Sequence, residues 1–307
     1  MKHYAFIDYA TQGYLALVGI LVIGLRNSST PEWALLAGGH ALAIVLIHLL
    51  LRAHAAHPEN RILDFLRHFY PVLLYAGFYR ETGALNHLLG LGYLDPFFIR
   101  LETRIFGEQP SLTFMDRLPY LPVSELFYAS YFSYYVMIGG VGLALYLRDR
   151  RQFFHYVSVV SFVFYVCYLI YVFVPVIGPR VFWESAECPL PPDLAPVPPP
   201  TFPAAVTAGP FYQVMLLIYR WFEAPGAAFP SSHVAVAITT VCFSFRYLRR
   251  IRWAHFGVML LLCAATVYCR YHYVVDVAAG ALTAAALVPL AHALYRRFGG
   301  AAPAGPA

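Results

Sequence analysis

His272 and Asp276 have side chains and a spacing that suit nucleophilic catalysis. They lie four residues apart in the segment Arg270–Asp276, a separation that places two side chains on one face of a helix. The carboxylate can hold the Nδ1 proton of the imidazole, which leaves Nε2 free to attack an electrophile. A carboxylate inside a membrane segment also needs a partner. The alternative is a structural pair whose only role is to satisfy its own polar groups.

Pro230–His233, with the sequence Pro-Ser-Ser-His, supplies groups suited to binding and protonating a phosphate ester. A serine after proline is a typical helix N-cap, so Ser231 and Ser232 predict a helix start whose free N–H groups and dipole bind an anion. His233 would then lie in the first turn, where it can protonate a leaving oxygen. The alternative is simple capping beside an interfacial histidine.

Arg180 and Arg270 are the cations placed to bind phosphoryl oxygens, because a guanidinium matches phosphate geometry with two parallel hydrogen bonds. Arg270 lies two residues before His272, and Arg180 ends a Gly-Pro-Arg turn after another apolar segment. Their alternatives are an arginine that extends to interfacial water and an ordinary surface turn. A metal site built from His233, His272 and Asp276 is the chemical rival. Two arginines would repel a dication there, so we expect neither a metal nor a cofactor.

The composition places these residues in a membrane protein. The chain of 307 residues is 60% hydrophobic and 12% charged, about half the charged content of a soluble domain. Several windows are apolar for close to the 20 residues or so that cross a hydrocarbon core. The 24 Tyr and 24 Phe can furnish aromatic belts at the membrane interfaces. The fold class that follows is an all-α integral membrane protein.

We predict about eight transmembrane helices, a six-helix core preceded by two extra helices. The third is the weakest, because it carries Arg67, His68 and Pro71. The eight segments are Tyr14–Leu25 (with a start nearer Phe6 as an option), Trp33–Leu51, Ile62–Phe78, Glu125–Leu147, Tyr156–Ile177, Ser232–Leu248, Trp253–Cys269 and His272–Leu294.

These segments divide the chain into two N-terminal helices in residues 1–61, a catalytic membrane domain in 62–298 and a disordered tail in 299–307. The half-polar stretch near 85–106 predicts an interfacial helix, and 211–222 predicts a shorter one. The connection 178–231 forms an outer loop, and its proline-rich part, 189–203, is not expected to be helical.

Arginines in the short loops predict the orientation of the chain. If all eight segments cross, twelve basic residues fall on one side, which is then cytoplasmic. These are Lys2, Arg52, Arg61, Arg148, Arg150, Arg151, Arg246, Arg249, Arg250, Arg252, Arg296 and Arg297. The net charge of +5 is then a topology signal, with no need for nucleic acid as a partner. We expect a plasma (inner) membrane protein whose site faces the non-cytoplasmic side.

The order and spacing of these motifs resemble the type-2 phosphatidic acid phosphatase superfamily, over roughly residues 62–294. Pro230–His233 matches that family's Pro-Ser-x-His motif in full, and Gly-Pro-Arg resembles its first motif without the opening lysine. In the third motif only Tyr271 separates Arg270 from His272, where the phosphatases place five residues. This short spacing is closer to the inositol phosphorylceramide synthase and sphingomyelin synthase branch.

The resemblance implies a metal-independent lipid phosphotransferase or phosphatase. His272 would form a phosphohistidine, Asp276 would orient it, and His233 would protonate the leaving group. The groups that would bind the phosphoryl oxygens as charge redistributes are Arg180, Arg270, Ser231 and Ser232.

We therefore expect a membrane phosphotransferase that moves a phosphoryl group or phospho-headgroup from a lipid phosphate or phospholipid to a polyol or lipid alcohol. The alternative is a lipid phosphate phosphatase, in which water accepts the phosphoryl group of phosphatidate or a polyprenyl phosphate. A third interpretation is a non-catalytic lipid transporter that uses the charged cluster as a headgroup path.

Other polar residues carry smaller expectations. Asp95 and Glu102 are expected to be structural, with an acceptor site as the alternative. Cys188 and Cys269 both lie near the predicted outer face, where a disulfide between them is conceivable but not required. The tyrosines between 128 and 135 are expected to pack in the core and its interface rather than form a ligand cage.

Overall fold

The computed structural model describes residues 4–86, 88–183, 201–222 and 225–298, and all regular elements within them are helices. This confirms the all-α prediction. The helices are α1 (Phe6–Leu25), α2 (Trp33–Ala56), α3 (Arg61–Leu85), α4 (Asp95–Phe106), α5 (Pro110–Arg117), α6 (Leu121–Arg148), α7 (Arg150–Phe173), α8 (Pro179–Phe182), α9 (Ala204–Thr207), α10 (Pro210–Phe222), α11 (Ser232–Tyr247), α12 (Arg252–Tyr268) and α13 (Val274–Arg297).

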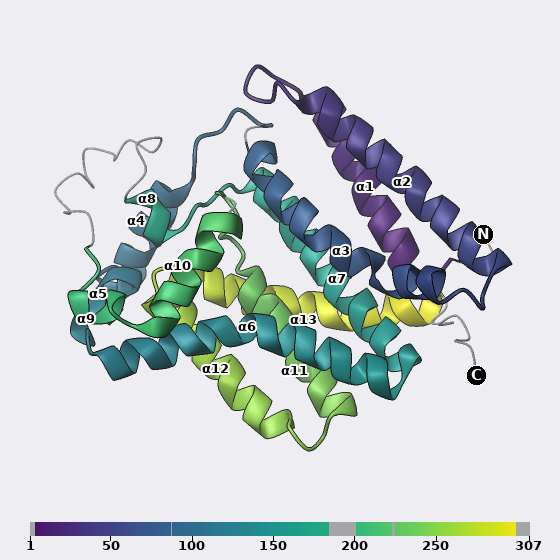
Figure 1. The fold of residues 1–307 in the computed structure, drawn as a ribbon. Helices are drawn as coiled ribbons and strands as arrows, with labels where there is room; N and C mark the ends of the chain where they lie inside the picture. Colours follow the sequence, from purple (N-terminus) through teal and green to yellow (C-terminus); the bar gives the residue numbers. More distant parts are fainter. Residues whose placement is uncertain (1–3, 87, 184–200, 223–224, 299–307) are drawn as a thin grey trace.

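Helix α7 is the centre of the bundle and packs against α1, α3, α6, α11 and α13. Its sequence is apolar or aromatic on every side, as expected of a helix surrounded by other helices. Small hydroxyl residues, Ser158 among them, are fully buried and donate to the carbonyl one turn earlier. Figure 1 shows α11 and α13 beside α7, so the helices that carry the chemical motifs are held by the core.

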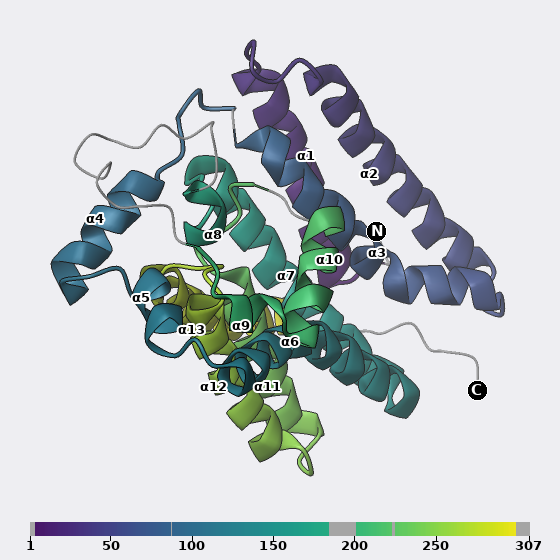
Figure 2. The same ribbon diagram turned by 60° about the vertical axis from the view of Figure 1, so that its left-hand side comes forward.

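Helices α1 and α2 form a hairpin on the outer side of α3 and α7 (Figures 1 and 2). α2 exposes much of its apolar surface; Leu35, for example, is 74% exposed. An apolar helix left so open is suited to lipid rather than water. The small helices α4, α5, α8 and α9 gather at the other side of the molecule in both views.

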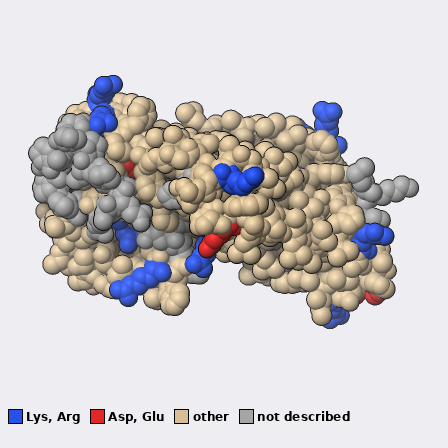
Figure 3. Space-filling model, turned by 90° about the horizontal axis from the view of Figure 1, so that it is seen from above, with Lys and Arg blue, Asp and Glu red and all other residues tan. Residues whose placement is uncertain are grey.

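Among the described residues, five helices are long and apolar enough to cross a membrane, namely α1, α2, α6, α7 and α13. On the face drawn in Figure 3 most of the surface is uncharged, and charged side chains form small separate spots. The chain is therefore an integral membrane protein, but the predicted count of eight spans is not reached. Helix α3 is too polar, and α11 and α12 have only 16 and 17 residues.

Several predicted boundaries shift by a turn or more. Helix α3 continues through Pro71 to Leu85, and the predicted interfacial stretch becomes a helix only at Asp95. Helix α13 begins at Val274, so His272 precedes the helix instead of lying on it. The short helices α5, α8 and α9 were not predicted. The proline-rich segment up to residue 200 and the tail 299–307 lie outside the described residues, as does Cys188.

Candidate active site

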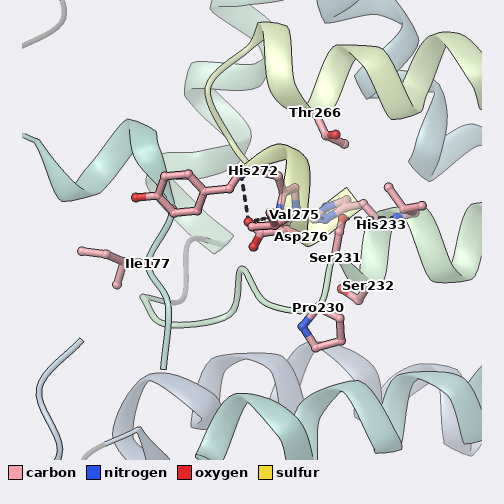
Figure 4. A network of polar contacts seen from close by, with 12 residues as sticks. Ile177, Pro230, Ser231, Ser232, His233, Thr266, His272, Val275 and Asp276 are labelled. Atoms are coloured by element: carbon pink, nitrogen blue, oxygen red, sulfur yellow. Dashed lines mark hydrogen bonds and ion pairs between the residues drawn. The ribbon is translucent and has the colours of Figure 1, made fainter. Parts of the chain in front are cut away.

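The predicted histidines and Arg180 line one small cavity where three connections meet: the start of α8, the start of α11 and the turn from α12 to α13. The cavity has a volume of about 40 Å³, a few times the 10–15 Å³ or so that one water needs. Its walls include Tyr131, Tyr219, Tyr271 and the backbone around Ala228. This size fits a phosphoryl group better than a whole lipid. Figure 4 shows His233, His272 and Asp276 together, with Ser231 and Ser232 beside them.

His272 and Asp276 are brought together although they do not share a helix face. His272 Nδ1 lies 3.4 Å from Asp276 Oδ2, within ion-pair distance but longer than a good hydrogen bond. The same Oδ2 accepts the Tyr273 N–H at 2.9 Å, which caps the start of α13. Burial lowers the pKa of His272 to about 4, against an opposing effect of the Ala228 backbone. The imidazole is therefore neutral near pH 7, as a nucleophile must be.

His233 lies in the first turn of α11, as predicted, and connects His272 to two tyrosines. Its Nδ1 is 3.3 Å from His272 Nε2, and its Nε2 is 2.9 Å from the Tyr131 hydroxyl. Tyr131 in turn shares a hydrogen bond of 2.7 Å with Tyr219. From the sequence Tyr131 is expected only to pack, because a tyrosine in an aromatic helix carries no local sign of its partner. The structure places it against the proposed acid.

The proposed nucleophile, acid and carboxylate do not converge as metal ligands. Asp276 approaches the Nδ1 side of His272, whereas His233 approaches Nε2 on the opposite side of the ring. Within the described ranges, no group of three or more His, Cys, Asp or Glu side chains is arranged to hold a metal ion. The three-ligand site considered from the sequence therefore does not form among these residues.

Arg180 enters the cavity from α8, and its position is fixed by the tightly constrained backbone at Gly178. Gly178 has φ +89°, and a Cβ there would lie 2.6 Å from the Tyr271 carbonyl oxygen, so only glycine fits. The Arg180 guanidinium lies over the rings of Tyr219 and Tyr271, with its carbon 4.5 Å and 5.5 Å from their centroids. These cation–π contacts hold the charge at the cavity wall.

Asp95 joins the first motif to the third. This fully buried carboxylate accepts hydrogen bonds from the N–H groups of Ile177 and Gly178, both at 2.9 Å, and from the Tyr273 hydroxyl at 3.0 Å. Burial raises the pKa of Asp95 to about 6, against the lowering effect of these donors. Its contacts are those of a positioning residue, which agrees with the structural role expected for it.

Glu102 has a similar place about two turns further along α4. Its Oε1 accepts the Val275 N–H at 3.1 Å, so it caps the helix that carries Asp276. The side chain is fully buried, and burial raises the pKa of Glu102 to about 7. The helix α4 thus binds both the segment before Arg180 and the start of α13.

Ser231 and Ser232 are engaged by the protein and do not line the small cavity. The Ser231 hydroxyl accepts the Val234 N–H at 3.3 Å, which confirms it as the N-cap, and the Ser232 N–H donates to the Tyr171 hydroxyl at 3.2 Å. The Ser231 N–H donates to the Asp276 carbonyl at 3.0 Å. Three N–H groups of this helix start are therefore already bonded, and the Ser231 N–H fixes α11 against α13.

Arg270 points away from the histidines. Its guanidinium donates to Asp116 at 2.7 Å and to the Thr201 carbonyl at 3.1 Å, and its side chain is fully buried. Its φ of +63° is a left-handed conformation that costs free energy in a residue other than glycine. The ion pair with Asp116 therefore helps to stabilise the turn that carries His272. Sequence spacing alone could not reveal on which side of that turn the guanidinium would lie.

A second, apolar cavity of about 460 Å³ adjoins the small one, and both have Tyr79, Tyr219 and His233 in their walls. The large cavity lies between α3, α6, α7, α10 and α11 and is lined mainly by aromatic side chains. Its volume is typical of a ligand pocket. On α10, the neighbouring Leu217 and Trp221 are 57% and 70% exposed, so this helix has an apolar outer face.

The model of the PAP2 superfamily matches residues 98–290, which include most of α4, all of α5 to α12, most of α13 and every residue of the small cavity except Tyr79. No curated protein and no solved structure matches the chain. The matched region is well over half of the sequence and contains the two histidines, the carboxylate and Arg180. The chain therefore belongs to the PAP2 superfamily of membrane phosphatases and phosphotransferases, which act on phosphate esters.

Proposed function

We propose that this enzyme transfers the phosphoryl group or phospho-headgroup of a lipid to an alcohol acceptor through a phosphohistidine on His272. The observation that carries the proposal is the shared wall between the small polar cavity and the large apolar one. A phosphate ester bound beside His233 and Arg180 would have its apolar chain directed into the aromatic cavity. Burial of that chain would stabilise the complex by roughly 0.8 kcal/mol for each methylene.

In the proposed first step, His272 Nε2 attacks phosphorus, and the bond from phosphorus to the leaving oxygen breaks. His233, which must enter this step as the imidazolium, gives its Nδ1 proton to that oxygen and becomes neutral, and its Nε2–H stays bonded to the Tyr131 hydroxyl. Arg180 binds the phosphoryl oxygens as charge moves onto them, which is the kind of interaction that contributes most to such catalysis. Asp276 balances the positive charge that forms on the His272 ring.

In the proposed second step, His233 takes the proton of the acceptor hydroxyl, whose oxygen attacks the phosphohistidine. The bond between nitrogen and phosphorus breaks, and His272 is restored. The 3.3 Å distance between His272 Nε2 and His233 Nδ1 leaves no room for a phosphoryl group between the two atoms. The two rings must therefore move apart when substrate binds. Arg270, Ser231 and Ser232 support this site by fixing its three connections, and direct phosphate binding is proposed for Arg180 alone.

Hydrolysis is the second candidate, with water as the acceptor. It is favoured by the size of the small cavity, because about 40 Å³ leaves room for little more than a water beside a phosphoryl group. The inositol phosphorylceramide synthase and sphingomyelin synthase branch, indicated by the short third motif, favours transfer. The match to the PAP2 superfamily is compatible with both transfer and hydrolysis, so it does not choose between them.

One experiment separates the two candidates. Purified protein is given a lipid donor labelled in its headgroup, with and without a polyol or lipid alcohol acceptor. Transfer predicts that the label appears in a new lipid or phospho-alcohol, whereas hydrolysis predicts free phosphate regardless of acceptor. The His272→Ala variant is the control and should release neither product. Turnover by that variant would contradict the phosphohistidine itself.

We also propose that the site faces the non-cytoplasmic side, as the arginine-rich loops predict. With native cysteines removed, a cysteine introduced at Ala195 should react with a membrane-impermeant thiol reagent on intact cells. A cysteine at Gln152, near the start of α7, should react only after permeabilisation. The reverse pattern would place the chemistry on cytoplasmic lipids.

A further inference from the structure

A second polar cavity lies at the end of the bundle opposite the catalytic site. It has a volume of about 220 Å³ and lies between the start of α7 and the ends of α11 and α13. Helices α11 and α13 begin at the catalytic site and have 16 and 24 residues. At 1.5 Å per residue, the two cavities are roughly 25–35 Å apart. The residues that line this one are Arg151, Gln152, His155, Arg246, Tyr247, His292, Tyr295 and Arg296.

The rim of this cavity carries three arginines from three helices, and its lining has no carboxylate. Arg151, Arg246 and Arg296 are exposed, and they form no ion pair with any residue that the structure describes. Their neighbour Arg150, by contrast, is paired with Asp64 at 2.8 Å. The nearest acidic residue, Asp149, uses its side chain to cap α7 through the Arg151 N–H. Three positive charges therefore surround a space that no anion among the described residues fills.

The floor of the cavity is an ordered hydrogen-bond chain. His155 Nε2 lies 2.8 Å from His292 Nδ1, and His155 Nδ1 lies 3.0 Å from the Tyr247 hydroxyl. Both nitrogens of this buried imidazole are thus satisfied by the protein. Within the described part of the chain, His292 Nε2 has no hydrogen-bond partner, so the chain of bonds ends in an atom free to bond a ligand.

We propose that this cavity, at the opposite end of the bundle from the catalytic site, binds a phosphate-bearing anion. Guanidinium groups from three directions can surround the phosphate oxygens with charge-assisted hydrogen bonds. His292 Nε2 can bond one further oxygen from the floor. The anion is either the headgroup of a lipid, since the cavity lies at helix ends, or a soluble phosphate ester.

Two simpler roles of these arginines do not account for the cavity. Arg246 and Arg296 lie in the last turns of their helices, where cations complement the helix dipole. Arg151 lies at the opposite, positive end of α7, so the helix dipole does not account for a cation there. Arginines that served only as a topology signal would need neither a shared cavity nor a polar histidine floor.

The test measures equilibrium binding of radiolabelled inorganic phosphate to the full-length protein in phosphatidylcholine nanodiscs. The double variant Arg246→Gln/Arg296→Gln removes two charges from the rim. Arg249→Gln/Arg250→Gln is the matched control, because these arginines are equally exposed in the next turn and do not line the cavity. Wild type and both variants bind phosphate equally at the catalytic cavity. The phosphate bound at the second polar cavity is therefore the amount bound by wild type minus the amount bound by the rim variant.

We expect the rim variant to lose one class of phosphate site, with affinity at least about ten-fold weaker, while the control keeps it. Arg151→Gln should weaken the same class, and it provides an independent variant if the double one has a lower unfolding temperature. Equal binding by wild type, the rim variant and Arg151→Gln would overturn the proposal. Equal weakening in the control would also overturn it, because binding would then follow surface charge in general.

A second arm distinguishes the two sources of the phosphate. The measurement is repeated in nanodiscs that contain a phosphonate analogue of phosphatidic acid, which the catalytic site cannot hydrolyse. Loss of the difference between wild type and the rim variant would identify a lipid headgroup as the occupant. Persistence of the difference would identify a soluble anion.

Discussion

Buried charges are used differently at the two sides of the molecule. In α1 and α3, Asp8 and Arg67 form an ion pair of 2.6 Å, and Asp8 also accepts from the Tyr70 hydroxyl at 2.6 Å. Both charged groups are buried, and the Asp8 carboxylate also accepts the Ala5 N–H at 2.7 Å. At the catalytic site the carboxylates Asp95 and Glu102 accept backbone N–H groups, while Arg180 and two histidines face a cavity.

The contrast separates structural from chemical polar groups in this membrane protein. A buried charge is costly in either place, so it must have a partner. In the first region the carboxylate and the guanidinium are paired with each other. In the second, Asp95 and Glu102 accept backbone N–H groups, and the Arg180 guanidinium and the two histidines line a cavity that can hold a ligand. The family match begins at residue 98, so the ion pair of α1 and α3 lies outside it.

Loss of the nucleophile should have the largest effect on activity. His272→Ala is expected to lower turnover by at least about 10³-fold, because the covalent step has no other nucleophile. The unfolding temperature should stay within a few degrees of wild type. Initial rates with a labelled lipid donor, measured beside thermal unfolding, check both. A residual rate of more than a few per cent would contradict the mechanism.

Loss of the proposed acid should be the next largest effect. His233→Ala is expected to lower the rate by about 10²–10⁴-fold, the usual contribution of a positioned acid–base group. An ester whose leaving group has a low pKa should recover part of this loss, because it needs no proton. The ratio of rates with the two leaving groups is the measurement. Equal losses with both esters would remove His233 from this role.

In the region of α1 and α3, Asp8→Ala should lower the free energy of unfolding and leave the catalytic rate unchanged. Removal of the carboxylate leaves the buried Arg67 without its counter-charge, which is expected to cost about 3–5 kcal/mol in the free energy of unfolding. Glu108→Ala is the control, because its pair with Arg117 is largely exposed and should contribute under about 1 kcal/mol. Denaturant titration measures both. Activity per folded molecule should be unchanged in Asp8→Ala.

Filling the apolar cavity should impair lipid substrates selectively. Ala76 lines this cavity, and Ala76→Trp is expected to raise KM for a long-chain phosphate ester by about ten-fold, because bound chain and indole would occupy the same space. A short, soluble ester should be hydrolysed or transferred at the wild-type rate. Gly77→Ala is the control, since a Cβ there meets nothing within 4 Å. Equal effects on both esters would argue against this cavity as the chain site.

The smallest effect concerns pH. Burial holds the pKa of His272 near 4 in the folded protein, whereas the unfolded value is about 6.5. The unfolded state therefore binds the proton first, and stability is lost as pH falls from about 6.5 to 4, by at most about 1.4 kcal/mol per pH unit. His272→Asn should flatten this part of the profile. Asp95 and Glu102, with raised pKa values, act with the opposite sign, so the measurement is the difference between variant and wild type in unfolding temperature.

Much of the fold follows from local sequence. Long apolar runs predicted the helices of the bundle, and the Pro-Ser-Ser-His segment predicted the Ser231 cap, because capping depends on a few adjacent residues. The count of eight spans is not shown where length and polarity are marginal, as in α3 and α12. Hydropathy measures composition, and it does not register that Arg67 is neutralised by Asp8 fifty-nine residues away.

The candidate site was predictable only in part for the same reason. His272, Asp276, His233 and Arg180 carry recognisable spacings, and the structure brings them together. The hydrogen bonds of Asp95 and Tyr131 join residues that are 82 or more positions apart in the sequence, so no local motif predicts them. The direction of Arg270 depends on Asp116 in a short helix that the sequence did not predict.

The bond from the Ser231 N–H to the Asp276 carbonyl has a consequence for biosynthesis. It joins the start of α11 to α13, and a Cβ at Gly280 would lie 2.5 Å from the Ser231 carbonyl oxygen, so the two helices meet without intervening side chains. Domains of this kind assemble as the chain emerges from its N-terminal end. Arg180 and His233 are therefore synthesised before His272, the proposed nucleophile, and before the Asp276 carbonyl that accepts the Ser231 bond. With this mechanism, competence for chemistry arises only once α13 is in place.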